Sequence, residues 1–182
     1  MPIEMEMSLF FRACPAPIVG VTGTKGKTTV STLAGALLRE ALPATRVGGN
    51  MGVTALGQLE DLSPEAPIVL ELSSWQLEAL IEHKLAPRVA VLTLIAEDHL
   101  NTYDGFEDYA ATKRGITQHQ RPEDYLVVNR DDPESWRAAS ETAAANFKRG
   151  VTKSMHPLEM GCGGAPLYGT NAALASPAGA EM

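Results

Sequence analysis

The sequence lacks features that several classes of protein require. Its two cysteines, Cys14 and Cys162, lie far apart and in no metal-ligand spacing, so we interpret them as two unrelated thiols. No segment approaches the roughly 20 uninterrupted apolar residues of a membrane span. Residues 1–11 also lack the basic start and apolar run of a signal peptide. We therefore expect a cytoplasmic protein with no membrane partner.

An excess of basic residues is absent as well, since the formal net charge is −7. This disfavours nucleic acid as a partner, because nucleic-acid binding requires a basic face. It does not exclude a phosphate ligand, because backbone N–H groups at the start of a helix bind anions without net positive charge. With 182 residues, 45% of them hydrophobic, the chain is long enough for one domain with a sizeable core.

Hydrophobic patterning indicates an α/β fold. Continuous apolar runs are typical of strands that are covered on both faces. They predict strands at 18–22, 67–72, 89–95 and 125–129, with a short fifth at 46–49. Helices are predicted between them at 27–41, 75–81, 106–119 and 133–145, the last with Asp132 as its N-cap. In the first helix, Leu33 and Leu37 belong to the predicted apolar face. The alternation favours a doubly wound, mostly parallel sheet.

The turn between the first strand and the first helix consists of Gly23, Thr24, Lys25, Gly26, Lys27, Thr28 and Thr29. Such a glycine-rich turn is typical of a phosphate site, because glycines let the backbone approach the phosphates. Lys27 would reach the β- and γ-phosphates of ATP, and the Thr28 hydroxyl would bind Mg²⁺. The strict G-x-x-x-x-G-K-[ST] pattern is not met, since Val21 stands at its first glycine. The alternative is a Gly/Thr-rich turn without a ligand, which the flanking strand and helix disfavour.

This turn resembles the nucleotide loop of the Mur ligase family, which also includes folylpolyglutamate synthases. Further segments, in the family's order, resemble its MurD-type branch. They are Gly48-Gly49-Asn50-Met51-Gly52, the stretch LELSSWQLE at 70–78, Glu97-Asp98-His99-Leu100, and the Y-x-A-x-K pattern from Tyr109 to Lys113. Cys14-Pro15-Ala16-Pro17 before the first strand also resembles that branch. The resemblance implies the family's central domain, a three-layer P-loop NTPase-like fold with a mostly parallel sheet.

The resemblance implies an ATP-dependent amide ligase of peptidoglycan synthesis. MurD-type enzymes join D-glutamate to UDP-N-acetylmuramoyl-L-alanine, and these two molecules would be the partners. ATP first phosphorylates the substrate carboxylate, and the amine of D-glutamate then attacks the acyl phosphate. Because phosphate moves between anions, the site must neutralise charge with a lysine and Mg²⁺.

Residue roles also follow from the resemblance. Lys27, His99 and Lys113 would be catalytic. Thr28 and Glu71 would hold one Mg²⁺, while His99 and a carbamylated Lys113 would serve a second. The substrate contacts, or residues that order the site, would be Asn50, Ser73 and Gln76. Without the resemblance, His99 would be a loop residue, Lys113 a solvated helix lysine and Ser73 a helix cap.

The sequence departs from the family pattern near the second Mg²⁺. Leu94 stands where the family usually has Asn, and Asn101 where it usually has Asp. Thr102 and Tyr103 replace the usual Arg and aromatic or histidine. One amide and one carboxylate are therefore missing from that region, which weakens the prediction of a second metal and of full catalytic rate.

We divide the chain into a linker leading into the domain at 1–16, the central ATP-binding domain at 17–150, and an edge of that domain or a poorly ordered tail at 151–182. Family enzymes add an N-terminal UDP-binding domain and a C-terminal domain that contacts adenine and the incoming amino acid. We find neither in the sequence, and expect a central-domain fragment that is inactive alone. The alternatives are a nucleotide-binding module without turnover and, more weakly, a generic P-loop NTPase.

Overall fold

A six-stranded parallel sheet forms the centre of the computed structural model, which describes residues 4–52, 54–98, 101–144 and 146–150. In spatial order the strands are β2 (Arg46–Gly49), β3 (Ile68–Glu71), β1 (Ile18–Thr22), β4 (Val89–Leu92), β5 (Tyr125–Val128) and β6 (Asn146–Gly150). Neighbouring strands pair in parallel, with Val21 beside Glu71 on one side and Val91 on the other. Connections leave β1 and β4 in opposite directions along the sheet, so the carboxyl ends of these strands define a switch point, where open α/β sheets bind ligands.

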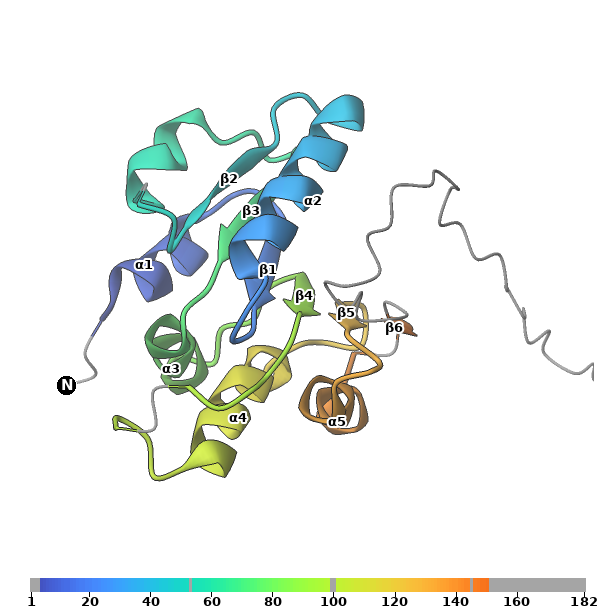
Figure 1. Ribbon diagram of the computed structural model, residues 1–182. Helices are drawn as coiled ribbons and strands as arrows, with labels where there is room; N and C mark the ends of the chain where they lie inside the picture. Colours follow the sequence, from blue (N-terminus) through green and yellow to red (C-terminus); the bar gives the residue numbers. More distant parts are fainter. Residues whose placement is uncertain (1–3, 53, 99–100, 145, 151–182) are drawn as a thin grey trace, which may run out of the picture.

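Helices cover both faces of this sheet. Helix α2 (Lys27–Ala41) lies on one face, whereas α3 (Ser74–Glu82) and α4 (Phe106–Arg114) lie on the other, as right-handed crossovers require (Figure 1). Helix α5 (Pro133–Glu141) packs beside α4 and β5. Two short 3₁₀ turns are η1 (Leu56–Asp61) and η2 (Gly115–Thr117). The fully buried core includes Ile68, Leu70, Leu72, Leu77, Leu92 and Leu126. These observations confirm the predicted α/β class with a parallel sheet.

The start of the chain differs from the expected linker. Residues Glu6–Ala13 form helix α1, which packs against α3 and η1. Its Met7 and Phe10 side chains are buried in the main core. The apolar residues of this segment alternate with Glu4, Glu6 and Ser8, and its partner elements lie about 50 residues or more away in the sequence, so the segment did not suggest a helix. Only their burial against α3 shows that the segment belongs to the folded unit.

Element boundaries differ from prediction in several places. The strand predicted at 89–95 ends at Leu92, and the helix predicted at 106–119 ends at Arg114, where η2 continues the chain. Helix α5 ends at Glu141 rather than 145, although Asp132 is its N-cap as expected, accepting a hydrogen bond from the Ser135 backbone N–H at 2.9 Å. The β6 strand was not predicted.

The buried side of α2 is also different from the predicted apolar face. Leu33 and Leu37 are exposed, while Ser31 and Gly35 face the sheet. A Cβ at Gly35 would lie 2.2 Å from Cγ2 of Val47, so this helix approaches β2 more closely than a leucine would allow. Within the described ranges, no helix is long and apolar enough to cross a bilayer.

Candidate nucleotide and metal site

The turn after β1 adopts a conformation that requires glycine. Gly23 has φ of 143° and Gly26 has φ of 85°, both in a region that side chains disfavour. Gly26 is the N-cap residue of α2, and it has no side chain to cap the first backbone N–H groups of the helix. Unsatisfied donors at a helix start, next to a cationic Lys27, form an anion site. The predicted phosphate loop therefore has the backbone geometry that its function requires.

The segment that follows β4 fixes the position of this loop. The Thr24 backbone N–H donates to the Leu94 carbonyl at 2.6 Å. The Thr24 hydroxyl donates to the Ala96 carbonyl and accepts from the Ala96 backbone N–H, each at 3.0 Å. The Thr93 hydroxyl donates to the Lys25 carbonyl at 2.7 Å. No sequence pattern predicted these contacts, because the residues that form them lie about 70 positions apart in the chain.

Thr28 and Glu71 meet at the carboxyl ends of β1 and β3. The Thr28 hydroxyl donates to Oε2 of Glu71 at 2.7 Å, and Glu71 is only 4% exposed. A hydroxyl and a carboxylate oxygen are hard ligands of the kind that Mg²⁺ prefers, with water and phosphate oxygens completing its shell. In the part of the chain that the structure describes, no three Asp, Glu, His or Cys side chains gather as a metal site. The arrangement thus fits Mg²⁺ held largely by phosphates rather than an all-protein metal cage.

The glycine-rich turn after β2 lies against Glu71. Gly49 has φ of 93°, and a Cβ there would lie 2.3 Å from the Glu71 carbonyl oxygen. The Asn50 backbone N–H donates to that same carbonyl at 2.9 Å. Sequence similarity identified this Gly-Gly-Asn segment, and the structure supplies the physical reason for its second glycine. Asn50 itself is exposed beside the carboxyl end of β3.

Two lysines approach the loop from different elements. The Lys27 Nζ donates to the carbonyls of Gly23 and Thr24 at 3.0 and 3.1 Å. The Lys113 Nζ lies 3.5 Å from Oγ1 of Thr22, and the residue is only 2% exposed. Lys113 is therefore not the solvated helix lysine of the alternative interpretation.

The environment of Lys113 favours its neutral form. The pKa of Lys113 is lowered from 10.5 to about 8, mainly by burial and also by the positive charge of Lys27. The carboxylates of Asp98 and Glu71 partly offset these two effects. Since Lys27, Asp98 and Glu71 all act on Lys113, the charged groups expected at the site lie within electrostatic reach of one another. A neutral amine is the form of lysine that reacts with CO₂ to give a carbamate.

Tyr109 joins the phosphate loop to Lys113. Its hydroxyl forms a 3.2 Å hydrogen bond with Oγ1 of Thr24, and the Lys113 Nζ lies 5.3 Å from the centre of its ring. Tyr109 and Lys113 are four residues apart on α4 and so share one face of the helix. Tyr103 packs edge to face on Tyr109, with centroids 5.3 Å apart. Tyr109 was part of the recognised Y-x-A-x-K pattern, but sequence alone gave no reason for its role.

Ser73 and Gln76 cap helix α3. The Gln76 backbone N–H donates to Oγ of Ser73 at 3.3 Å, and the Ser73 backbone N–H donates to Oε1 of Gln76 at 2.9 Å. This reciprocal pair is a capping box. Ser73 is thus the N-cap of α3, which was the alternative to a substrate-binding role. Its contact with substrate stays a prediction. His99 and Leu100 lie outside the described residues, so the role predicted for His99 also stays a prediction.

Fold and site together define a P-loop nucleotide-binding domain of the α/β class. Comparison with known families agrees: residues 21–157 match the model described as the Mur ligase middle domain. The chain belongs to this family, which confirms the resemblance found in the sequence.

Two similar relatives share one name within this family. The chain is 52% identical over 131 residues to a UDP-N-acetylmuramoylalanine–D-glutamate ligase of Roseiflexus sp. (strain RS-1), covering 72% of this chain and 28% of that protein. It is 44% identical over 131 residues to the protein of that name from Symbiobacterium thermophilum, with the same coverages of 72% and 28%. The chain thus spans little more than a quarter of the length of these relatives.

Solved structures agree on the fold. The MurF ligase of Thermotoga maritima, determined in complex with ADP, matches with a TM-score of 0.57 and 27% identity. The match covers 72% of this chain and 33% of that one. A UDP-N-acetylmuramoyl-L-alanyl-D-glutamate–2,6-diaminopimelate ligase matches with a TM-score of 0.54 and 24% identity, over 74% of this chain and 31% of that one.

Proposed function

We propose that this chain is the ATP- and Mg²⁺-binding central domain of a cytoplasmic ligase that joins D-glutamate to UDP-N-acetylmuramoyl-L-alanine in peptidoglycan synthesis. The 2.7 Å contact between Thr28 and Glu71 beside the phosphate loop is the observation that carries the proposal. It supports the proposal because a hydroxyl and a carboxylate oxygen, both suitable ligands for Mg²⁺, lie close to the uncapped start of α2. The names of the two relatives support the choice of substrates.

Each residue of the site has a chemical task in this proposal. The loop 23–29 and Lys27 bind the ATP phosphates and neutralise their charge. Thr28 and Glu71 hold Mg²⁺, which withdraws electron density from the phosphate oxygens. The substrate carboxylate takes up the transferred phosphoryl group, and the amine of D-glutamate then displaces phosphate from the acyl phosphate.

Lys113 serves the same chemistry as a carbamate. Its neutral amine adds to the carbon of CO₂ and loses a proton, which leaves a carboxylate-like group beside Thr22. With His99, this group supports a second Mg²⁺ near the substrate carboxylate. The lowered pKa of Lys113 supports this step, because an ordinary lysine of pKa 10.5 is almost wholly protonated at neutral pH. Asn50, which follows β2, and Ser73 and Gln76, at the start of α3, contact the muramoyl substrate or order the site in this proposal.

Calorimetric titration of the chain with ATP–Mg²⁺ tests the first part of the proposal. We expect weak binding that Lys27→Ala abolishes, because this substitution removes the ammonium from the loop while keeping the glycines. Arg137→Met, on the exposed surface of α5, is the matched control and should bind as the wild type does. Absence of heat at millimolar nucleotide, with Lys27→Ala indistinguishable from wild type, would contradict nucleotide binding.

A second candidate is a nucleotide-binding module without turnover. Leu94 favours it, because this residue contributes only its backbone carbonyl to the loop where the family usually has an amide side chain. Asn101, in place of an acid, favours it as well. The isolated chain should form no product under either candidate. Joining it to N- and C-terminal domains of a relative and measuring phosphate release with D-glutamate distinguishes them: release that depends on D-glutamate supports the ligase.

A further inference from the structure

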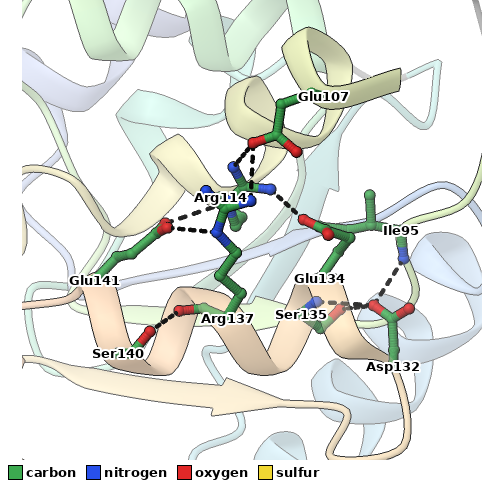
Figure 2. A network of polar contacts seen from close by, with 9 residues as sticks. All are labelled: Ile95, Glu107, Arg114, Asp132, Glu134, Ser135, Arg137, Ser140 and Glu141. Carbon is green, nitrogen blue, oxygen red and sulfur yellow. Dashed lines mark hydrogen bonds and ion pairs between the residues drawn. The ribbon is translucent and has the colours of Figure 1, made fainter. Parts of the chain in front are cut away.

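A cluster of five charged side chains joins α4 to α5, and we call it the Arg114 cluster. It consists of Arg114, Arg137, Glu107, Glu134 and Glu141 (Figure 2). Arg114 bonds a different carboxylate through each nitrogen: Nη2 to Glu107 at 2.7 Å, Nη1 to Glu134, and Nε to Glu141 at 3.2 Å. Only the planar fork of an arginine can hold three carboxylates in this way.

The position of Arg114 in the fold is unusual for an ion pair. Its side chain is only 5% exposed, whereas that of Arg137 is 48% exposed and forms ion pairs with Glu107 and Glu141. A buried ion pair contributes little net stability compared with apolar packing, so it is weak evidence for a purely stabilising role. Arg114 directly follows Lys113, and neighbouring residues on an α-helix point about 100° apart. Any rotation of α4 that moves Arg114 therefore moves Lys113 as well.

The start of α5, which carries Glu134, is hydrogen-bonded to the segment that follows β4 and holds the phosphate loop. Oδ2 of Asp132 accepts hydrogen bonds from the backbone N–H groups of Ile95 at 3.1 Å and Ser135 at 2.9 Å (Figure 2). The next residue, Ala96, is bonded to Thr24 of the loop. Glu134, a partner of Arg114, lies two residues after Asp132.

These contacts connect α4, the phosphate loop, the 93–96 segment and the start of α5 in a closed circuit. Helix α4 is attached near its middle, where Tyr109 bonds Thr24, and at its end, where Arg114 bonds Glu134. The start of α5 and the 93–96 segment complete the connection between these two attachments. Because both attachments lead to the same hydrogen-bonded segments, they oppose rotation of α4 about its axis relative to the loop.

We propose that Arg114 is a positioning residue: its three-carboxylate contact fixes the rotation of α4 and thereby holds the Lys113 amine over Tyr109 and beside Thr22. The importance of that placement for catalysis rests on the proposed function, but the placement itself does not. Arg114 is not among the residues expected to contact substrate, and in this proposal it acts through Lys113. The position of the Lys113 amine can therefore be followed by a spectroscopic measurement on the nucleotide-free chain.

The test follows the Lys113 ε-methylene protons by NMR in the chain labelled with ¹³C-lysine, with Lys113→Met assigning the signal. In the wild type, these protons should show an upfield ring-current displacement and nuclear Overhauser contacts to the Tyr109 ring. Arg114→Lys keeps the charge but not the fork, and Glu134→Gln keeps the shape but not the charge. Both should lose the displacement and the contacts at temperatures well below their unfolding midpoints.

Arg137→Met is the control, because it removes the exposed arginine of the same cluster. It should keep the Lys113 signal unchanged even where its unfolding midpoint falls. A wild-type Lys113 signal in folded Arg114→Lys and Glu134→Gln would overturn the proposal, and so would equal loss in Arg137→Met. If Arg114→Lys does not fold, Glu134→Gln decides the question. No nucleotide is present, so failure here and failure to bind ATP–Mg²⁺ are separate outcomes.

Discussion

Replacing Lys113 by methionine should stabilise the folded chain at neutral pH. The folded state buries an ammonium whose pKa falls from 10.5 to about 8, mainly through burial. This fall corresponds to about 3 kcal/mol of destabilisation when the lysine is charged. Methionine has a similar length and no charge, so it fills the same space without this cost. The variant should therefore be about 3 kcal/mol more stable than the wild type at pH 7.

The pH dependence of this difference gives the sharper test. Above about pH 8 the folded chain loses the Lys113 proton, while the unfolded chain keeps it up to about pH 10.5. The unfolded state then binds more protons, so the stability of the wild type rises with pH across this window. The advantage of Lys113→Met should consequently be full below pH 8 and should shrink toward zero near pH 10.5.

Urea unfolding at several pH values between 7 and 10.5, in CO₂-free buffer, measures the difference. Excluding CO₂ matters because a carbamate would remove the positive charge. Lys25→Met is the matched control, since it makes the same replacement at a lysine that is exposed in the phosphate loop and buries no charge. A Lys113→Met difference that is constant across the range, or a variant less stable than wild type at pH 7, would refute the reasoning.

Two further substitutions test the local geometry. Gly23→Ala should destabilise the chain by about 2 kcal/mol, because its Cβ would lie 2.1 Å from Oγ1 of Thr93 at a φ of 143°; urea unfolding checks this, and unchanged stability would contradict the strained loop. Ser73→Ala should cost about 1 kcal/mol by removing the N-cap of α3, with Ser73→Asp restoring most of it. Equal losses in both Ser73 variants would argue against a capping role.

Much of the fold could be predicted from short stretches of sequence. The glycines and Lys27 of the 23–29 loop, between an apolar strand and a helix, predicted the phosphate turn, because positive φ angles and helix starts are encoded within a few residues. Asp132 was predicted as an N-cap for the same reason. The helix at Glu6–Ala13 was missed, because its two core residues bury against an element more than 60 residues away.

In the candidate site too, residue identities were predicted from the sequence, whereas contacts between distant residues were not. Sequence similarity identified Glu71 and Lys113, but no local pattern shows that Thr28 bonds Glu71 or that Lys113 is buried beside Thr22. The exposed Leu33 and Leu37 show that even a helix periodicity can predict the wrong face when small residues allow close packing against a strand.

The order of residues along the chain was enough to predict the phosphate loop, the strands that precede its functional segments, and membership of a ligase family. The folded chain adds the direct contact between Thr28 and Glu71, the burial of Lys113, and the bonds through which Arg114 and Asp132 connect α4 to the loop. The physical reason is that backbone conformation depends on neighbours in the chain. Distances across the sheet depend instead on the order β2-β3-β1-β4-β5-β6, which places residues 43 to 91 positions apart within hydrogen-bonding reach.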